Sequence, residues 1–285
     1  MIKMLAHKLK EVKELFRKKS SKVGLAIVIS ITIIALLAQY LAPYDPYEFV
    51  GHPYEPPSTK HLLGTDDVGH DILSQLIYGA QVSLLVGVLS AIGCTLIGTL
   101  IGLIAGFLGG WVDELLMRLT DIVLVIPYLV FIIVLVSYLG PSIWNIILSI
   151  SLLGLPSIAR MVRSHVLSLR ESLYVEAARA IGCGDMHIMS KHIIPGLVPL
   201  ITPIFVLTII DGILTEAGLS FLGLGDPTKI SWGIMLYYAQ VRGAFVKGLW
   251  WWVLPPGLLI MLTGLGFLLL GSSLEEYFNP RLRRR

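Results

Sequence analysis

The chain has 285 residues, of which 55% are hydrophobic and 14% are charged, and its formal net charge is +3. Soluble globular domains average about 25% charged residues, so this chain has too few charges to cover a soluble surface of its size. Its composition also excludes a disordered, collagen-like or disulfide-scaffold protein. The composition therefore predicts a protein that crosses a lipid bilayer several times.

Six stretches are apolar and long enough to cross a bilayer as helices, which takes about 20 residues. None alternates with the period of two that barrel strands require, so the predicted fold is an all-α bundle of six transmembrane helices. Gly140-Pro141 divides one long uncharged run into two spans, because proline removes a backbone donor. The predicted spans are 23–42, 80–108, 115–139, 142–161, 196–214 and 249–270.

The first span lies between a basic segment, 1–22, and a polar segment, 43–79, for which we expect an extended loop and an interfacial helix. Its apolar run exceeds the roughly 7–15 residues of a signal-peptide core. We therefore interpret 23–42 as a retained anchor. The other five spans form a predicted core at 80–272, which is followed by a tail at 273–285.

Lysine and arginine are concentrated on one side of these spans. Segment 1–22 carries eight of them, 160–194 carries five and the tail carries four, whereas 43–79 carries one and 215–248 carries three. Short loops rich in lysine and arginine remain in the cytosol. We therefore expect a multi-pass protein of the cell membrane, with both termini and the loop 162–195 in the cytosol.

The second span is rich in glycine, and three of its glycines recur at every fourth position. Gly98, Gly102 and Gly106 therefore share one helical face, which allows another helix backbone to approach closely in lipid. Plain helix packing is the simpler interpretation, and a sliding surface in a moving bundle is the functional alternative.

Charged residues at membrane depth are costly and usually face protein or water. Asp113 lies in the turn between the second and third spans, and Arg118 and Asp121 are close enough on one helix to pair locally. We interpret these three as structural charges. Asp211 and Glu216 either line a water-filled path for a polar substrate or lie at the outer interface, and they are the candidate path residues.

The outer segment contains four neighbouring acidic or histidine residues, Asp66, Asp67, His70 and Asp71. Thr65 or Asp66 is expected to cap a helix that starts here, and an acidic residue favours the first helical turn. The four residues lack the spacing of a known metal site. Capping and solvation are therefore their expected roles, and we assign no metal ligand in this chain.

The cytosolic loop 162–195 is the most informative part of the chain. Apolar residues recur at helical spacing over 166–180, and Gly182 is suited to end that helix in a left-handed conformation. Asp185 is expected to cap a second short helix. Pro195 stands at the start of the fifth span, where a missing backbone donor costs little.

A small surface with charge on both sides lies within this loop. Ala177 and Ala178 expose little bulk, and Glu176 and Arg179 flank them. Such a surface is suited to dock into a groove of a soluble partner.

At these residues the chain resembles the permease subunits of ABC importers. Their cytosolic signature is EAA, three residues, glycine, nine residues and an ending similar to I-x-L-P, in which His192 and Ile194 take the isoleucine and leucine positions here. The resemblance implies that this loop forms the coupling helix region, which contacts an ATPase. The residues implied in coupling are Glu176, Ala177, Ala178, Arg179, Gly182, Asp185 and Pro195.

Two further segments are similar to the dipeptide, oligopeptide and nickel branch of that family. Residues 63–84 resemble its outer-helix motif, although His70, Gln75 and Gln81 stand where arginine is usual. Residues 214–233 resemble its outer segment before the last span. The resemblance thus covers nearly the whole chain.

The resemblance implies a type I importer in a prokaryotic plasma membrane. Its other parts would be a second, similar permease subunit, two ABC ATPase subunits or domains, and an extracytoplasmic solute-binding protein. ATP and Mg²⁺ would be used by the ATPases, and we expect no cofactor and no nucleic acid on this chain. The sequence agrees, since it shows no phosphate-binding loop and no set of nucleophile and base, so we do not expect an enzyme.

We therefore expect a permease subunit that moves di- or oligopeptides, or a related small solute, inward by alternating access. One alternative is an ion-coupled secondary transporter, which would need inverted repeats or helices broken at the midplane. Another is a membrane-embedded enzyme that uses Asp113, Asp121 or Asp211. Uptake driven by an ion gradient without ATPases would favour the first, and turnover by the isolated chain would favour the second.

Overall fold

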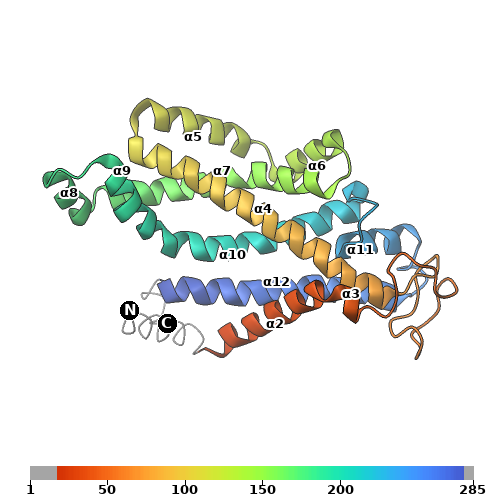
Figure 1. The fold of residues 1–285 in the computed structure, drawn as a ribbon. Helices are drawn as coiled ribbons and strands as arrows, with labels where there is room; N and C mark the ends of the chain where they lie inside the picture. The colour runs from red at the N-terminus through yellow and green to blue at the C-terminus, as the bar shows by residue number, and fades with distance from the viewer. Residues whose placement is uncertain (1–17, 279–285) are drawn as a thin grey trace.

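A computed structural model describes residues 18–278 of the chain. They form an elongated bundle of helices (Figure 1), and extended pairing within the described part is limited to an isolated bridge between Thr65 and Asp71. The basic residues at 1–17 and 279–285, which contribute to the predicted orientation, lie outside the described residues.

Long helices run along the bundle, and short helices lie mostly toward its two ends (Figure 1). Two of the elements, η1 and η2, are π-helical turns. In chain order the elements are α2 (Lys19–Leu36), α3 (Ala38–Leu41), α4 (Ile72–Leu108), α5 (Gly110–Val125), α6 (Tyr128–Leu139), α7 (Ile143–Arg170), α8 (Leu173–Ala180), α9 (Asp185–Ile188), η1 (Met189–Ile193), α10 (Ile194–Leu219), η2 (Ser220–Leu224), α11 (Trp232–Val241) and α12 (Trp250–Phe278).

Five helices are long and apolar enough to cross a membrane, and a sixth span results if the bent pair α5 and α6 counts as one. The span predicted at 115–139 is therefore not one straight helix, because α5 and α6 meet at 90°. The break lies at Ile126 and Pro127. Ile126 has an extended backbone, with φ −83° and ψ 131°, as a residue before proline prefers.

The helix α4 begins before the predicted span, at Ile72 rather than residue 80, and its 37 residues are about 55 Å long. The Asp71 carboxylate caps it by accepting the backbone N–H of Ser74 at 2.8 Å. The expected cap at Thr65 or Asp66 is therefore wrong. Asp66 instead accepts three backbone N–H groups of the turn that follows it.

The other long helices also differ in extent from the predicted spans. The anchor predicted at 23–42 begins as α2 and continues as the short α3 after a break at Leu37. The helices α7, α10 and α12 continue past the ends predicted at residues 161, 214 and 270. Helix-forming residues such as Arg163 follow there instead of proline, so nothing stops the helix at the membrane boundary.

The helices α4 and α7 pack closely through the glycine face of α4. A Cβ atom at Gly98 would lie 2.8 Å from the carbonyl oxygen of Leu155, and one at Gly106 would lie 2.9 Å from that of Arg163. At Gly102 a Cβ atom would collide with another backbone carbonyl of α7. The prediction that these glycines pack against a helix backbone is confirmed.

The segment 42–71, here called the cap segment, covers one end of the bundle. The buried His61 ring nitrogen Nδ1 lies 3.0 Å from a carboxylate oxygen of Asp71, and Nδ1 of His70 lies 2.8 Å from one of Asp66. The histidines and acids of this region therefore bond to one another and hold the loop together.

The cap segment is joined to the end of α11 by an ion pair. The Asp67 carboxylate lies 2.8 Å from Nε of Arg242. Burial raises the pKa of the Asp67 carboxyl above its usual value, the neighbouring Asp66 raises it further, and Arg242 opposes both effects. This contact fixes the loop against the helices that lead into α12.

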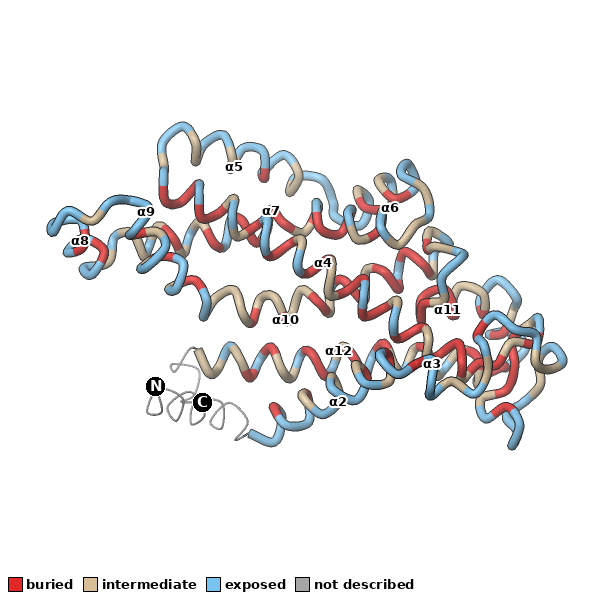
Figure 2. Tube along the Cα trace, in the orientation of Figure 1, coloured by how far each residue is buried: buried red, intermediate tan, exposed pale blue. Residues whose placement is uncertain are grey.

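The last helix, α12, packs between α2 and α10. A Cβ atom at Gly24 of α2 would lie 2.8 Å from the carbonyl oxygen of Gly266 in α12, so these two backbones are also close. Figure 2 shows that buried residues are frequent along α4 and α7, whereas most of α5 is exposed. The exposed side chains of these helices are largely apolar, as expected where lipid or another membrane subunit covers them.

Candidate functional site

The helix α8 projects with α9 from one end of the bundle (Figure 1), here called the α8 end. The single helix predicted over 166–180 is interrupted, because α7 ends at Arg170 and α8 begins at Leu173. Between them Ser172 has an extended backbone, and its hydroxyl donates to the carbonyl oxygen of Leu169. A serine that bonds to the preceding helical turn in this way competes with continuation of the helix.

The end of α8 is fixed by Gly182, which has φ +84°. Its N–H donates to the carbonyl of Arg179 at 2.9 Å, and the N–H of Cys183 donates to that of Ala178 at 3.0 Å. These two bonds form a Schellman motif. The predicted left-handed glycine cap is confirmed.

One face of α8 is buried against the bundle. Val175 is fully buried and Ala178 nearly so. They belong to an apolar cluster that includes residues of α4, α7, α9, η1 and α10, so that α8 packs on a structure continuous with the long helices. The cluster contains Cys94, Leu103, Phe107, Ile158, Val162, Val166, Val175, Ala178, Ile188, Ile193 and Leu197.

The opposite face of α8 is exposed and carries the signature charge. Glu176 and Ala177 are exposed on it, and Leu173 and Ile181 are 83% and 81% exposed at its two ends. The two alanines of the signature therefore differ, since Ala177 faces outward and Ala178 packs inward. An exposed apolar surface with a central carboxylate is typical of a protein docking site.

The chain returns from α8 to the membrane without a separate second helix. Asp185 is the first residue of α9, Gly184 occupies the cap position, and no side chain caps the helix. The expected Asp185 cap is therefore wrong. The helix continues through the π-turn η1 into α10, where Pro195 lies in the first turn as predicted.

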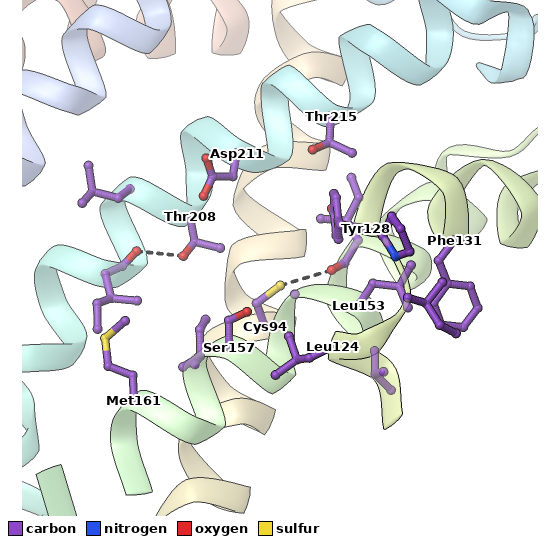
Figure 3. Close-up of a pocket in the computed structure, with 18 of the residues that line it drawn as sticks. Cys94, Leu124, Tyr128, Phe131, Leu153, Ser157, Met161, Thr208, Asp211 and Thr215 are labelled. Carbon is purple, nitrogen blue, oxygen red and sulfur yellow. Dashed lines mark hydrogen bonds between the residues drawn. The ribbon is translucent and has the colours of Figure 1, made fainter. Parts of the chain in front are cut away.

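A cavity of about 730 Å³ lies between α7, α10 and the bend of α5 and α6, with α4 behind it (Figure 3). This volume is within the range of small-molecule sites, about 300–1,000 Å³. Its walls are mostly apolar. The polar residues that line it are Cys94, Tyr128, Ser157, Thr208, Asp211 and Thr215.

Asp211 is the charged residue among those that line the cavity. Thr208 and Thr215 lie three residues before it and four after it on α10, and therefore share its helical face. The Thr208 hydroxyl donates to the carbonyl of Ile204 at 2.8 Å, which leaves its oxygen free to accept. The cavity thus combines one carboxylate, several hydroxyl groups and an apolar wall.

A second hollow continues from the cavity toward the α8 end. Its volume is about 590 Å³, and it shares Ser157 and Met161 with the cavity. Further along α7 it is lined by Ser164, His165 and Ser168. The polar face of α7 therefore connects the cavity to the region of α8.

Glu216 lies apart from the residues that line this cavity, contrary to its candidate role as a path residue. It is 2% exposed, and its Oε1 atom accepts hydrogen bonds from the hydroxyls of Ser220 at 2.7 Å and Ser231 at 2.6 Å. Glu216 therefore holds together the junction of α10, η2 and α11. Glu216 misses the cavity that Thr215 lines because consecutive residues of a helix point to different faces.

The three residues interpreted as structural charges all form ion pairs, but the expected pair of Arg118 with Asp121 is wrong. Arg118 pairs with an acid one turn earlier on α5, whereas Asp121 turns toward α7. Two of the three pairs therefore join α5 to α7. The pairs are Asp113–Arg163, Asp121–Arg160 and Glu114–Arg118.

Comparison with known proteins assigns this chain to a protein family. Residues 98–284 match the model of the binding-protein-dependent transport system inner membrane component, and residues 9–57 match the N-terminal transmembrane domain of oligopeptide transport permease C. The chain belongs to this permease family. It is a multi-pass inner-membrane permease of the oligopeptide class of binding-protein-dependent ABC importers, and not the ATPase of such a system. A system of this kind also requires an ATPase, a partner permease and a binding protein.

Individual relatives support the same placement. The glutathione transport system permease protein GsiD of Escherichia coli O6:K15:H31 is 38% identical to this permease over 272 residues, which are 94% of this chain and 89% of that protein. The GsiD protein of Shigella boydii serotype 4 matches with the same identity and coverage. The similarity therefore covers the anchor, the cap segment and the core.

Most residues that line the cavity of this permease were not predicted from the sequence. Thr208 and Thr215 could have been found, because with Asp211 they follow helical spacing on one face of an otherwise apolar helix. Tyr128 and Ser157 carry no such signal. They reach the cavity through the 90° bend before α6 and through the position of α7.

Proposed function

We propose that this permease carries peptide-like solutes into the cell as one of two permease subunits of an ATP-driven importer. The cavity beside α7 and α10 is one half of the path, and a second, similar permease subunit closes it from the open side. An extracytoplasmic binding protein delivers the solute. The support for a peptide-like solute is the match to oligopeptide permeases and the relation to permeases of glutathione transport systems.

The α8 end faces the cytosol in this proposal, and the cap segment faces outward. Arg170, Arg179 and Lys191 lie in or beside the loop that carries α8. The cap segment carries Lys60 as its single lysine or arginine. This asymmetry is the one that positively charged cytosolic loops produce, and it supports a cytosolic position for both termini.

Two ATPase subunits or domains bind the exposed face of α8 and drive alternating access. The ATPases bind ATP and Mg²⁺. We propose no cofactor and no nucleic acid for this chain. The observation that carries the proposal is that α8 has two different faces. Glu176 is exposed on one face, and Val175 on the other is buried in the same cluster as residues of α4, α7 and α10. A ligand shifts a conformational equilibrium only through different affinity for the two states, so α8 must bind open and closed ATPases differently.

Substitutions on α8 and at the glycine that ends it test this coupling. Glu176→Lys reverses an exposed charge, and Gly182→Pro is incompatible with the φ of +84° at that position. In proteoliposomes that contain the whole importer, we expect both variants to insert normally and to lose ATP-driven uptake by at least about tenfold, equivalent to 1.4 kcal/mol.

The matched control is Glu275→Lys, an exposed glutamate on α12 that makes the same charge change at the same end of the bundle. It should transport normally. Normal uptake by the two α8 variants would contradict the proposal, and uptake by an ion gradient without ATPases would replace it with a secondary transporter.

A further inference from the structure

The acid of the cavity differs from the other acids near membrane depth. Asp113 and Asp121 pair with arginines of α7, and Glu216 accepts two serine hydroxyls. Among the described residues, no hydrogen bond or ion pair involves Asp211, although it lines the cavity (Figure 3). This carboxylate therefore lacks a protein partner within residues 18–278 of its own chain.

Asp211 is exposed to the open cavity in this chain, and its unpartnered carboxylate becomes costly when a partner subunit and the solute exclude water from it. Placing an ionised group in surroundings of low dielectric is unfavourable unless an opposite charge is near. Arg160 and Arg163 of the neighbouring α7 are engaged by the acids of α5. A cation that enters the cavity would therefore be stabilised at Asp211 more strongly than elsewhere along the path.

The groups around Asp211 match one kind of cation. An ammonium group donates three hydrogen bonds and accepts none. The carboxylate and the Thr208 oxygen offer acceptors on a single face of α10, where Thr215 also lies and interacts with the hydroxyl of Tyr128. A divalent metal such as Mg²⁺ or Ca²⁺ would need about six oxygen ligands, usually with more than one carboxylate, which this wall does not supply.

We infer that Asp211 is a specificity-determining residue, which binds the protonated amine of the transported solute as it passes through the cavity. This inference rests on the proposed import function and adds the chemical feature of the solute that the permease itself recognises. The apolar wall, with Leu153 and Leu207 among its members, accommodates the uncharged remainder of the solute. The hydroxyl groups of α7 then lead toward the α8 end.

The test compares two solutes that differ in a single charge. The complete importer is reconstituted in proteoliposomes with its binding protein, and ATP-driven uptake is measured for a dipeptide with a free amino terminus and for its N-acetyl form. Each solute is supplied at a concentration that saturates the binding protein, established first by titration. Under these conditions the occupancy of the binding protein is equal, and a change in the ratio of the two uptake rates between wild type and a variant reports the permease.

We expect wild type to favour the free amine and Asp211→Asn to slow its uptake about tenfold, the effect of losing one hydrogen bond to a charged group. Uptake of the N-acetyl form should not change. Asp211→Glu keeps the charge and should keep the preference. The matched control Asp45→Asn, in the cap segment away from the cavity, should leave both rates unchanged.

Three results would overturn the inference while leaving the import function intact. Asp211→Asn could reduce both solutes equally, as it would if Asp211 pairs with a cation of the partner permease. The variant could change neither rate, or Asp211→Glu could lose the preference. If wild type shows no ATP-driven uptake of either solute, the proposed function fails first, and this inference fails with it.

Discussion

The two sides of α7 differ in how they meet their neighbours. Toward α4 the backbones are so close that a Cβ atom at Gly98 would lie 2.8 Å from a carbonyl oxygen of α7. Toward α10 the helices enclose a cavity of about 730 Å³ that holds a carboxylate and several hydroxyl groups. From this difference we expect α4 and α7 to move as one unit, and we expect the path to change volume on the α7–α10 side.

The helix α8 contacts both the closely packed α4–α7 pair and the helix α10. Its buried residue Val175 shares a cluster with Leu103 of α4, Val166 of α7 and Leu197 of α10. Arg170, at the end of α7, also donates to the carbonyl of Phe107 in α4 at 3.0 Å. We therefore expect a displacement of α8 to be transmitted to the closely packed pair and to the wall that carries Asp211.

The largest expected effect is on the closely packed side. In Gly102→Ala the added methyl group meets the backbone carbonyl of Ala159 and lies about 2.8 Å from Cβ of Val162. We expect a loss of about 1–3 kcal/mol of unfolding free energy, as in other overpacked cores, measured as a lower denaturation midpoint in detergent.

The control for this substitution is Gly264→Ala in α12, where the nearest atom to an added Cβ is 3.7 Å away. It should leave the midpoint unchanged or raise it slightly, because alanine favours a helix over glycine. Equal midpoints for the two variants would show that the α4–α7 contact is looser than described.

An intermediate effect is expected on the α7–α10 side, where a substitution would fill the cavity. Ser157→Phe places a ring where the cavity and the adjoining hollow meet. Uptake in proteoliposomes should fall by about tenfold, the ratio that corresponds to 1.4 kcal/mol, while the unfolding midpoint stays near wild type. A lower midpoint with normal uptake would show that this space is closed in the working complex.

The smallest effect is expected for the ion pairs that join α5 to α7. The side chains of Asp121 and Arg160 are both more than half exposed, so Asp121→Asn should cost less than about 1 kcal/mol of unfolding free energy. Asp113→Asn should cost more, because Asp113 is 15% exposed and both carboxylate oxygens bond Arg163. A reversed order in chemical unfolding would contradict this ranking.

Much of the fold follows from local patterns in the sequence. The glycine spacing of α4 predicts a close helix contact, and Gly182 predicts the end of α8, because each depends on the residue itself and on its neighbours along the chain. Helix ends are predicted less well. Asp71, not Thr65 or Asp66, caps α4, since three nearby residues offer suitable side chains and the loop fold selects one.

The cavity shows where local patterns stop. Asp211 is visible in the sequence as a charge at membrane depth, and it lines the cavity. Glu216 has the same signal, yet it lies in a packed junction with Ser220 and Ser231. Helical spacing places Glu216 on another face of α10 than Asp211, but the arrangement of α10 against α11 and of α6 across the 90° bend decides which face meets the cavity.

The most direct test of the coupling mechanism is a contact measurement on the working importer. A photo-crosslinking amino acid is placed at Ala177, on the exposed face of α8, and at Glu275 of α12 as the control position. In the assembled complex turning over ATP, we predict a crosslink from position 177 to the ATPase whose yield changes when hydrolysis is blocked. No crosslink from position 177 in a complex that transports solute would contradict the account.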